Sequence, residues 1–414
     1  MTKKSYDWEN GAELGEHSKR KLKILREYFF RYLTVKCGNP LQSNFRLAVV
    51  DGFSGAGRYK SGVSGSPLIF IEELQKAYQN INVRRAVQKL KPITFDCILF
   101  FNDVKSTVIE LLKQNLAPLI VDISERNPGL NIKIQYSTCI FEQQYRHIKA
   151  EIKKLKIQNV IFNLDQYGYT DVRKEIINDI MNSFKSVEIL YTFMIGAFLR
   201  YASPSDIPKI KKNLEPVGIS YDDLNSIRHI SDKKEWLGAV EKLLFDVFKE
   251  CSTFFTPFSI NHKDGYKYWL MHFANNYRAR QEYNNVLHNN ALHQAHFGRS
   301  GLNMLSYNSE DEGMLYLFDE EDRKVARGQL YYDIPNYISK LGGATQLREF
   351  YTKIFNDTPA HSDDIHKAII ENPDIEVITK AGGLRQKYNT IRVDDYIRLK
   401  EQKSFFIFFN DLEK

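Results

Sequence analysis

The stretch "VVDGFSGAGRY", Val49–Tyr59, joins an apolar run to a loop that carries three glycines. The apolar run "FRLAVVD" (45–51) has the composition of a buried strand and ends in Asp51. Gly55 and Gly57 would then let backbone N–H groups come close to a ligand, and glycine tolerates the positive φ that such a turn needs. The stretch therefore predicts the first strand-to-helix turn of a parallel sheet, with a binding site at its tip.

The spacing of this loop excludes two common phosphate-binding loops. A P-loop ends in Gly-Lys-Ser/Thr, whereas Arg58 and Tyr59 follow the last glycine here. A dinucleotide fingerprint reads G-x-G-x-x-G, whereas the first two glycines here are separated by two residues and the last two by one. Asp51 would also repel a pyrophosphate and would suit a cationic ligand. S-adenosylmethionine, with a sulfonium, an ammonium group and no phosphate, fits this chemistry; a tight turn without a ligand is the alternative.

Strand-like and helix-like segments alternate from the N-terminus to about residue 203. Most of the predicted strands are nearly all apolar, which is typical of strands that are covered on both faces, and "NIKIQYS" (131–137) alternates. The alternation predicts an α/β fold, a doubly wound parallel sheet of Rossmann type. The predicted strands are 45–51, 95–103, 131–137, 159–165 and 187–196, and the predicted helices are 17–33, 67–79, 106–116 and 171–184.

The remaining chain changes character twice. Residues 1–203 form the predicted Rossmann-like core, and residues 204–257 read as a helical insertion. Residues 258–335 are expected to complete the core sheet, with "YKYWLMHFA" as a strand and "LYLFD" (315–319) as an edge strand. Residues 336–414 give the order helix, helix, two strands, which predicts a winged-helix-like C-terminal domain.

Composition sets broad limits on function. The chain of 414 residues is 43% hydrophobic and 26% charged with a net charge of +7, which is typical of a globular protein and compatible with nucleic acid. It has no apolar run of about 18 residues, and "MTKKSYDWENG" has no apolar signal core, so a cytoplasmic protein without membrane contact is expected. Its four cysteines form no CxxC pair, and His288, His293 and His296 have no carboxylate beside them, so no metal site is expected.

Asp103, at the tip of the second predicted strand, is a candidate acceptor for the ribose hydroxyls of the same cofactor. It lies nearer fifty than twenty residues beyond the glycine loop, so an inserted segment over about 61–94 has to be assumed. An acid in this place is equally often the N-cap of the following helix, and that reading stays open.

The fourth predicted strand ends in "NLDQYGY". Methyltransferases that act on amino groups of bases place an acid, a turn and an aromatic ring at this location. Asp165 would accept the substrate N–H, and Tyr167 or Tyr169 would stack on a base rotated out of its helix. Gln166 replaces the rigid proline of the usual D-P-P-Y form, and a plain strand-to-helix turn is the alternative. Because the glycine loop, Asp103 and Asp165 all fall at carboxyl ends of parallel strands, they predict one crevice.

Taken together, these stretches resemble the three-Cys-motif partner protein (TcmP) family. The resemblance covers most of the chain and rests on "HSKRKLKILREYF", "VDGFSGAGRYKSGVSGSPL", "FNLDQYGY", "YKYWLMHFAN" and the winged-helix-like tail. The glycine loop also looks like that of the adenine-N6 methyltransferases that act on DNA or rRNA. The resemblance implies a methyltransferase-like protein that binds S-adenosylmethionine, and a partner that is radical-SAM-like and carries three clustered cysteines.

The resemblance also implies roles for individual residues. Asp103 would contact the ribose and Asp165 the reactive end, while His17 and Lys21 on an N-terminal helix would close over the methionine part. Two departures stand out: members of the family read D-P-Y-G where this chain has Gln166, and "YSTCIF" offers no acid for the adenine amino group. The residues of the glycine loop that the resemblance assigns to the cofactor are Asp51, Gly52, Gly55 and Gly57.

The tail has an uneven charge. Residues 341–414 contain eleven basic and twelve acidic residues, but Lys380 to Lys400 contains six basic and two acidic ones. A wing that contacts phosphates and a winged helix that docks on protein are both compatible with this pattern. The candidate nucleic-acid contacts are Lys380, Arg385, Lys387 and Arg392.

The sequence therefore predicts an S-adenosylmethionine-dependent methyltransferase-like protein that acts on a base amine in nucleic acid. The alternative is a catalytically inactive scaffold or specificity subunit that presents nucleic acid to a partner enzyme. A nuclease would need a tight cluster of acids with a lysine, and no such spacing is found.

Overall fold

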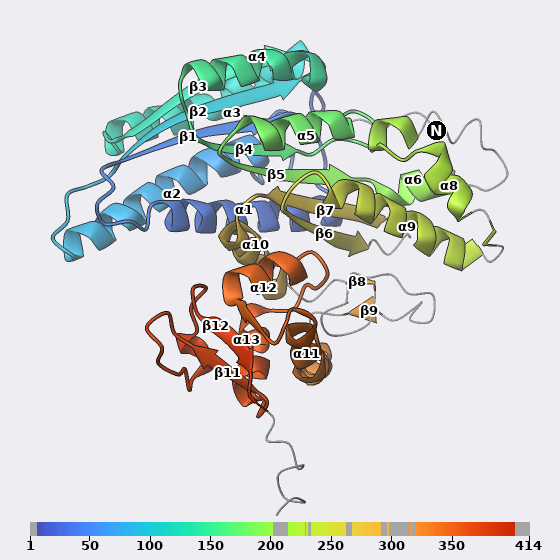
Figure 1. Cartoon of the computed structure of the whole chain (residues 1–414). Helices are drawn as coiled ribbons and strands as arrows, with labels where there is room; N and C mark the ends of the chain where they lie inside the picture. The colour runs from blue at the N-terminus through green and yellow to red at the C-terminus, as the bar shows by residue number, and fades with distance from the viewer. Residues whose placement is uncertain are drawn as a thin grey trace, which may run out of the picture. The chain divides into compact units, whose positions relative to one another are not determined.

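The computed structural model describes residues 6–201, 214–227, 229–230, 233–261, 267–290, 296–297, 315–316 and 320–401. The chain divides into two compact units (Figure 1). The sheet unit comprises residues 1–297 with 307–318, and the C-terminal unit comprises residues 298–306 with 319–414. None of the helices in the described ranges is long and apolar enough to cross a membrane.

A mostly parallel sheet forms the centre of the sheet unit. Its strands are β1 (Asn44–Asp51), β2 (Thr94–Asp103), β3 (Leu130–Thr138), β4 (Asn159–Leu164), β5 (Ser186–Phe193), β6 (Phe254–Asn261) and β7 (Lys267–Ala274). They lie in the order β3-β2-β1-β4-β5-β7-β6, in which the first five are parallel and β7 is antiparallel to both of its neighbours. The predicted α/β fold with a parallel sheet is confirmed. Its inner strands are buried along most of their length, which explains why they read as apolar runs.

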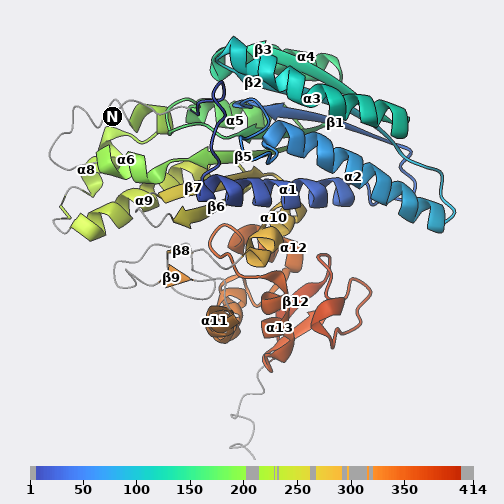
Figure 2. The same cartoon turned by 180° about the vertical axis from the view of Figure 1, so that it is seen from behind.

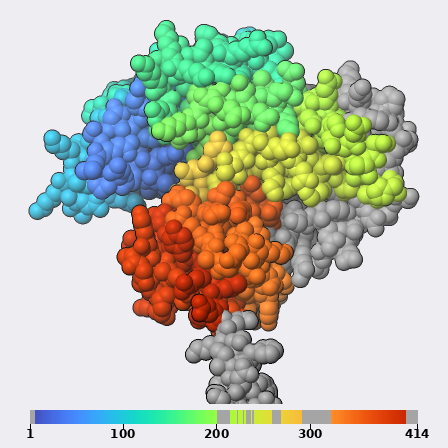
Figure 3. All heavy atoms as spheres, in the orientation of Figure 1, coloured from blue at the N-terminus to red at the C-terminus, as the bar shows by residue number. Residues whose placement is uncertain are grey.

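Helices cover both faces of this sheet (Figures 1 and 2). One face carries α1 (Glu16–Lys36), α2 (Ser66–Val87) and α3 (Ser106–Arg126), and α10 (Tyr277–Asn289) packs against α1. The other face carries α4 (Phe141–Lys154), α5 (Lys174–Ser183) and α9 (Lys233–Lys249), whose side chains cover much of it (Figure 3). Shorter segments after β5 are α6 (Ile195–Tyr201), the 3-10 turn η1 (Glu215–Val217) and α8 (Tyr221–Ser226).

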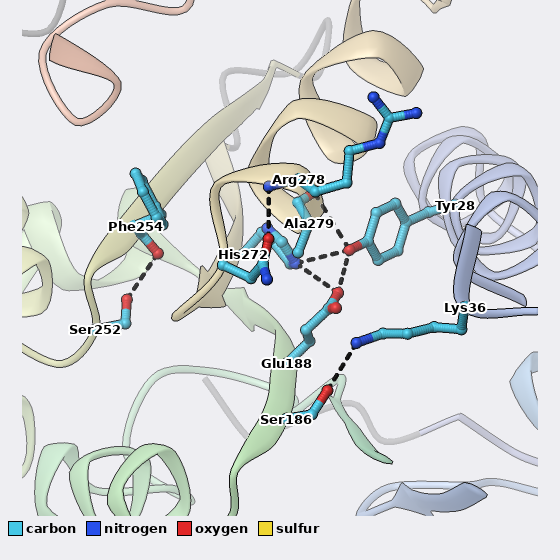
Figure 4. Close-up of polar contacts among 10 residues, drawn as sticks. Tyr28, Lys36, Ser186, Glu188, Ser252, Phe254, His272, Arg278 and Ala279 are labelled. Carbon is cyan, nitrogen blue, oxygen red and sulfur yellow. Dashed lines mark hydrogen bonds and ion pairs between the residues drawn. The ribbon is translucent and has the colours of Figure 1, made fainter. Parts of the chain in front are cut away.

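A buried polar cluster ties α1 and α10 to the sheet (Figure 4). Tyr28 of α1 donates its hydroxyl hydrogen to Oε2 of Glu188 on β5. Nε2 of His272 on β7 lies 3.3 Å from the same oxygen and 3.1 Å from the hydroxyl, and Tyr283 of α10 stacks on the His272 ring. Burial raises the pKa of Tyr28 well above its usual value, so the hydroxyl remains a donor. The cluster thereby fixes the helix that carries Lys21.

Three predicted features of the sheet unit differ from the structure. The segment 61–94 is no inserted piece but mostly the long helix α2, whose second half exposes valines that interrupt the helical apolar pattern. Residues 204–257 are not all helical, because β6 begins at Phe254; it contains a proline, which an edge strand tolerates. Residues 315–316 form β9, which pairs with β8 (His296–Phe297) and not with the edge of the main sheet.

The C-terminal unit combines helices with a small antiparallel sheet. Its elements are α11 (Glu320–Lys340), β10 (Ala344–Gln346), α12 (Leu347–Ile354), α13 (Ser362–Glu371), β11 (Ile375–Ile378), the 3-10 turn η4 (Tyr388–Thr390) and β12 (Tyr396–Leu399). The strand order is β10-β12-β11. The predicted order of two helices and two strands is present. The preceding helix α11 and the short strand β10 were not predicted, and α11 spans the boundary that the sequence placed at residue 336.

Candidate functional site

A cavity of about 500 Å³ opens at the carboxyl ends of β1, β2 and β4. The strand order reverses at β1, which lies between β2 and β4, so the cavity occupies the switch point at which open α/β sheets bind ligands. Its wall is formed by the N-terminal segment, α1, the glycine loop, the loops after β2, β3 and β4, and Tyr268 on β7. The volume lies within the usual range for small-molecule sites, about 300–1,000 Å³.

Most of the residues predicted for this unit meet at the cavity, and the others lie behind its wall. The cavity is lined by His17, Lys21, Gly55, Asp103, Asp165 and Tyr167, but not by Asp51, Gly52 or Gly57. Of the four loop residues predicted to contact the cofactor, Gly55 is the one that lines the cavity. Gly52 is needed for packing instead, because a Cβ there would lie 2.8 Å from the ring of Phe141.

Gly55 lies under an aromatic cluster that the sequence did not reveal. Its φ is +60°, and a Cβ there would lie 2.4 Å from Cζ2 of Trp8, so the indole rests directly on the backbone. Trp8 packs on Tyr59 and Tyr6, with ring centroids 4.9 and 5.5 Å away. All three rings line the cavity. "SYDW" has no periodic pattern, so nothing in the local sequence indicated that its rings would reach the glycine loop.

Asp103 connects the glycine loop to the loop after β2. Its Oδ2 accepts the amide hydrogen of Gly55 at 3.3 Å, and its Oδ1 accepts that of Lys105 at 3.0 Å. Partial burial raises the pKa of Asp103, and the two amides act in the opposite direction. The alternative role as a helix cap is wrong, because Lys105 occupies the N-cap position of α3. The carboxylate is left at the edge of the cavity, where it can accept hydrogen bonds from a ligand.

Two apolar side chains flank Asp103 at the mouth of the cavity. Val104 is 62% exposed and Ile140, in the loop between β3 and α4, is 54% exposed, and both line the cavity. Exposed aliphatic side chains facing one hollow offer a surface for a flat apolar group. The sequence did not single them out, because an isolated valine or isoleucine in a loop carries no signal.

Asp51 lies beneath the cavity and is fully buried. The Nδ2 of Asn163 donates to its Oδ1 at 3.2 Å. Burial raises the pKa of Asp51 to about 7, while Ser66 and Asn163 favour the ionised form and the nearby Asp165 opposes it. The side chain predicted to contact the cofactor thus lies behind the residues that line the cavity.

Asp165 forms an ion pair with Lys21 across the cavity wall. Nζ of Lys21 lies 2.5 Å from Oδ1 of Asp165, and the lysine is almost buried. Lys21 also lies 5.9 Å from the centre of the Tyr268 ring, on which His17 stacks at 5.0 Å with nearly parallel planes. The sequence predicted both partners as site residues but not their pairing, because they are 144 residues apart in the chain.

Gln166 fixes the loop that follows β4. Its Oε1 accepts the amide hydrogens of Asp171 and Val172 at 2.9 and 3.1 Å, and its Nε2 donates to the Tyr191 hydroxyl at 2.5 Å. The residue is 3% exposed. Its side chain thus supplies through hydrogen bonds the rigidity that proline gives the D-P-P-Y form.

Replacing Gln166 with alanine is expected to lower the free energy of unfolding by about 2–4 kcal/mol, because buried donors lose their acceptor. Urea denaturation measures this value. Gln114→Ala, on the exposed face of α3, is the matched control and should change it by less than about 0.5 kcal/mol. Equal effects of the two substitutions would contradict the assigned role of Gln166.

The two candidate stacking residues of this loop have different environments. Tyr167 is 41% exposed and lines the cavity. Tyr169 is 7% exposed and packs on Phe193 and Phe198, with ring centroids 5.8 and 5.4 Å away. Tyr167 is therefore the ring of the pair that is available to a ligand.

The four basic residues proposed for the tail are not equivalent. Arg385 binds Asp395 through two hydrogen bonds of 2.9 and 3.2 Å, which fixes the loop between β11 and β12. Lys380, Lys387 and Arg392 are exposed and have no ion pair among the described residues. Three of the four can therefore meet an external anion, and Arg385 has a structural role.

Among the described residues, no three or more side chains of His, Cys, Asp or Glu lie close enough together to hold a metal ion. His288 is buried in α10 and His296 belongs to β8, whereas His293 lies outside the described residues. Comparison of the chain with protein-family models gave no match, and comparison with curated proteins gave none either.

Proposed function

We propose that the sheet unit is a Rossmann-type, S-adenosylmethionine-dependent methyltransferase-like domain that acts on an amine. The observation that carries this proposal is the composition of the switch-point cavity, which combines carboxylates with aromatic faces. Asp103 and Asp165 lie among the rings of Trp8, Tyr59 and Tyr268. Carboxylates and aromatic faces both attract organic cations, and the carboxylates repel phosphates. A sulfonium ligand fits such a site better than a nucleotide does.

The arrangement of the sheet gives independent support. The order 3-2-1-4-5 is shared with dinucleotide-binding folds, but an antiparallel β7 lies between β5 and β6 here. An antiparallel strand at this place is typical of the Rossmann-type methyltransferase sheet.

Different lining residues fit different parts of S-adenosylmethionine. Asp103 would accept the ribose hydroxyls, and the apolar pair Val104 and Ile140 beside it would hold the adenine ring. At the other end, Lys21 and Asp165 would face the charged amino-acid part and the incoming amine. When bound, the cofactor supplies a methyl group that is already activated, so the residues act mainly by positioning.

A base amine in nucleic acid is the substrate class that this site favours. Tyr167 offers an exposed ring beside Asp165, where an extruded base could stack while its amino group donates to the carboxylate. The C-terminal unit, interpreted as a winged helix, would contribute phosphate contacts through Lys380, Lys387 and Arg392. A radical-SAM-like partner with three clustered cysteines follows from the family resemblance alone.

Calorimetric titration with S-adenosylmethionine tests the proposal. The wild-type protein should bind it in the micromolar range, and Asp103→Ala should weaken binding about 10- to 100-fold, since a hydrogen bond to a charged group contributes about 1.5–3 kcal/mol. Asp96→Ala removes a carboxylate from the opposite end of the same strand and should leave the affinity unchanged. Absence of binding at millimolar ligand, or equal affinities of the two variants, would overturn it.

The ion pair between Lys21 and Asp165 supports a second candidate, an inactive scaffold that presents nucleic acid to a partner. The carboxylate that would accept the substrate amine already has a cationic partner at 2.5 Å. A scaffold would bind nucleic acid in a gel-shift assay but would not bind S-adenosylmethionine, so the two candidates give opposite titration results.

A further inference from the structure

A small chamber of about 20 Å³ lies behind the ion pair of Lys21 and Asp165. These two residues, Leu22 and Ser66 line both the chamber and the large cavity, so they form the partition between them. The inner wall adds Asn163 and Thr192 to apolar residues of α1, β5 and β7. A space of this size, with several polar side chains around it, is enough for about one water molecule.

The chamber connects the cavity to Asp51. Asn163, on the chamber wall, donates to Oδ1 of Asp51 at 3.2 Å, and Ser66, also on the wall, interacts with the same carboxyl group. A polar route therefore runs from Asp165 through the chamber to a carboxyl group that is itself fully buried. Ser66, Asn163 and the backbone amide of Phe53 favour the ionised carboxylate, whereas burial without solvent makes that form costly.

We propose that Asp51 is a proton-exchanging group coupled to the cavity, so that binding of a cationic ligand beside Asp165 drives a proton from Asp51 to solvent. The inference deepens the proposed function and rests on it for the identity of the ligand. Asp51 is then a positioning residue that acts through Asp165 and the chamber and makes no contact with the ligand.

The charges around Asp51 give the sign of the effect. Two ionisable groups interact with Asp51, the carboxylate of Asp165 after β4 and the hydroxyl of Tyr59 in the glycine loop. From α1, Lys21 reaches the wall of the chamber. The residue that pairs with Asp51 on β2 is the apolar Phe101. Burial holds the pKa of Asp51 at about 7 in the free protein, so the group is mostly protonated at lower pH. A cation at Asp165 offsets the negative charge there and favours ionised Asp51, which releases a proton on binding.

The same coupling suits the transfer of a methyl group to an amine. The amine nitrogen forms a bond to the methyl carbon while the sulfur keeps the electron pair of the broken bond, and the nitrogen must then lose a proton. Asp165 can accept it and pass it through the chamber and the Ser66 hydroxyl to Asp51, because a hydroxyl can relay a proton whereas the Asn163 amide cannot. Methyl transfer moves the positive charge from sulfur to nitrogen, and the charge leaves the cavity with this proton, so Asp51 binds the proton more strongly than it does beside the bound sulfonium.

The coupling can first be measured in the free protein, by carbon-13 NMR titration of the aspartate carboxyl groups. One group should titrate near pH 7 and be absent from Asp51→Asn. Its midpoint should fall in Asp165→Asn, which removes the neighbouring negative charge, and stay unchanged in Asp171→Asn, which removes another carboxylate that lines the cavity. If Asp51→Asn does not fold, the proposal is decided by whether the midpoint of the group that titrates near pH 7 falls in Asp165→Asn. An ordinary midpoint near pH 4, or no response to Asp165→Asn, would overturn the proposal.

Binding supplies the second arm, by calorimetry in buffers of different ionisation enthalpy. Binding of S-adenosylmethionine should release up to about one proton near pH 6 and almost none near pH 8. Below pH 7 the affinity should therefore increase as the pH rises, by up to about tenfold per pH unit. S-adenosylhomocysteine, which lacks the sulfonium charge, should release fewer protons. Binding without proton release overturns the role of Asp51 and leaves the proposed function. No binding, with Asp51 still responding to Asp165→Asn, overturns the proposed function and leaves the coupling.

Discussion

Replacing Gly57 with alanine is expected to lower the free energy of unfolding by about 2–4 kcal/mol. Gly57 has a φ of +79°, which an alanine adopts only with strain. A Cβ there would lie 2.6 Å from Cδ1 of Leu68 and 2.7 Å from Cδ1 of Leu112, both of which are fully buried. The substitution therefore combines backbone strain with overpacking between α2 and α3, and chemical denaturation measures the sum.

Gly62→Ala is the matched control. Gly62 has almost the same φ, +81°, but nothing lies within 4 Å of the added Cβ. Its substitution should cost only the backbone part, about 1–2 kcal/mol. If both variants lost the same stability, the packing of Gly57 against the two leucines would contribute nothing, and the glycine would be required for its conformation alone.

Replacing Glu188 with alanine is expected to lower the free energy of unfolding by about 3–5 kcal/mol, more than the loss of one hydrogen bond would. Glu188 accepts the hydroxyl hydrogen of Tyr28 and lies 3.3 Å from Nε2 of His272, in the interior between α1, the sheet and α10 (Figure 4). Alanine would leave a cavity and two buried polar groups without this acceptor. Denaturation gives the loss, and hydrogen exchange at α1 should show faster opening.

Two milder variants separate the polar contribution from the cavity. Glu188→Gln keeps the volume and an acceptor oxygen, and Tyr28→Phe removes only the hydroxyl, so each should cost about 1–2 kcal/mol. If Glu188→Gln were as damaging as Glu188→Ala, the carboxyl group itself, and not the filling of the space, would be what stabilises the cluster.

The sequence was most informative where one segment carries the whole signal. The five parallel strands were located to within a few residues. The inner four are apolar along their length because both of their faces are covered, and the edge strand β3 was recognised from its alternating pattern. Helix ends were predicted less well: α2 extends to Val87 instead of residue 79, and α3 to Arg126 instead of 116. The later turns of both helices lie partly on the surface, where polar and β-branched residues are tolerated. The periodic apolar pattern that marks a helix in the sequence is therefore lost before the helix ends.

The candidate site was predicted in composition but not in arrangement. The carboxyl ends of parallel strands share one edge of the sheet, so Gly55, Asp103 and Asp165 could be expected together from their positions in the pattern. That rule does not say which side chains face the cavity. Asp51 ends its strand as expected and yet points below the cavity, where it is fully buried.

The sequence by itself determined the parallel sheet, the glycine turn and the acids at the strand tips, because backbone propensity and burial act over a few neighbouring residues. Only the tertiary structure decided that Trp8 lies on Gly55 and that Lys21 pairs with Asp165. It also decided that a chamber separates this pair from Asp51. These relations join segments that are far apart in the chain, and they exist only once α1 and the N-terminal segment pack over the ends of the strands.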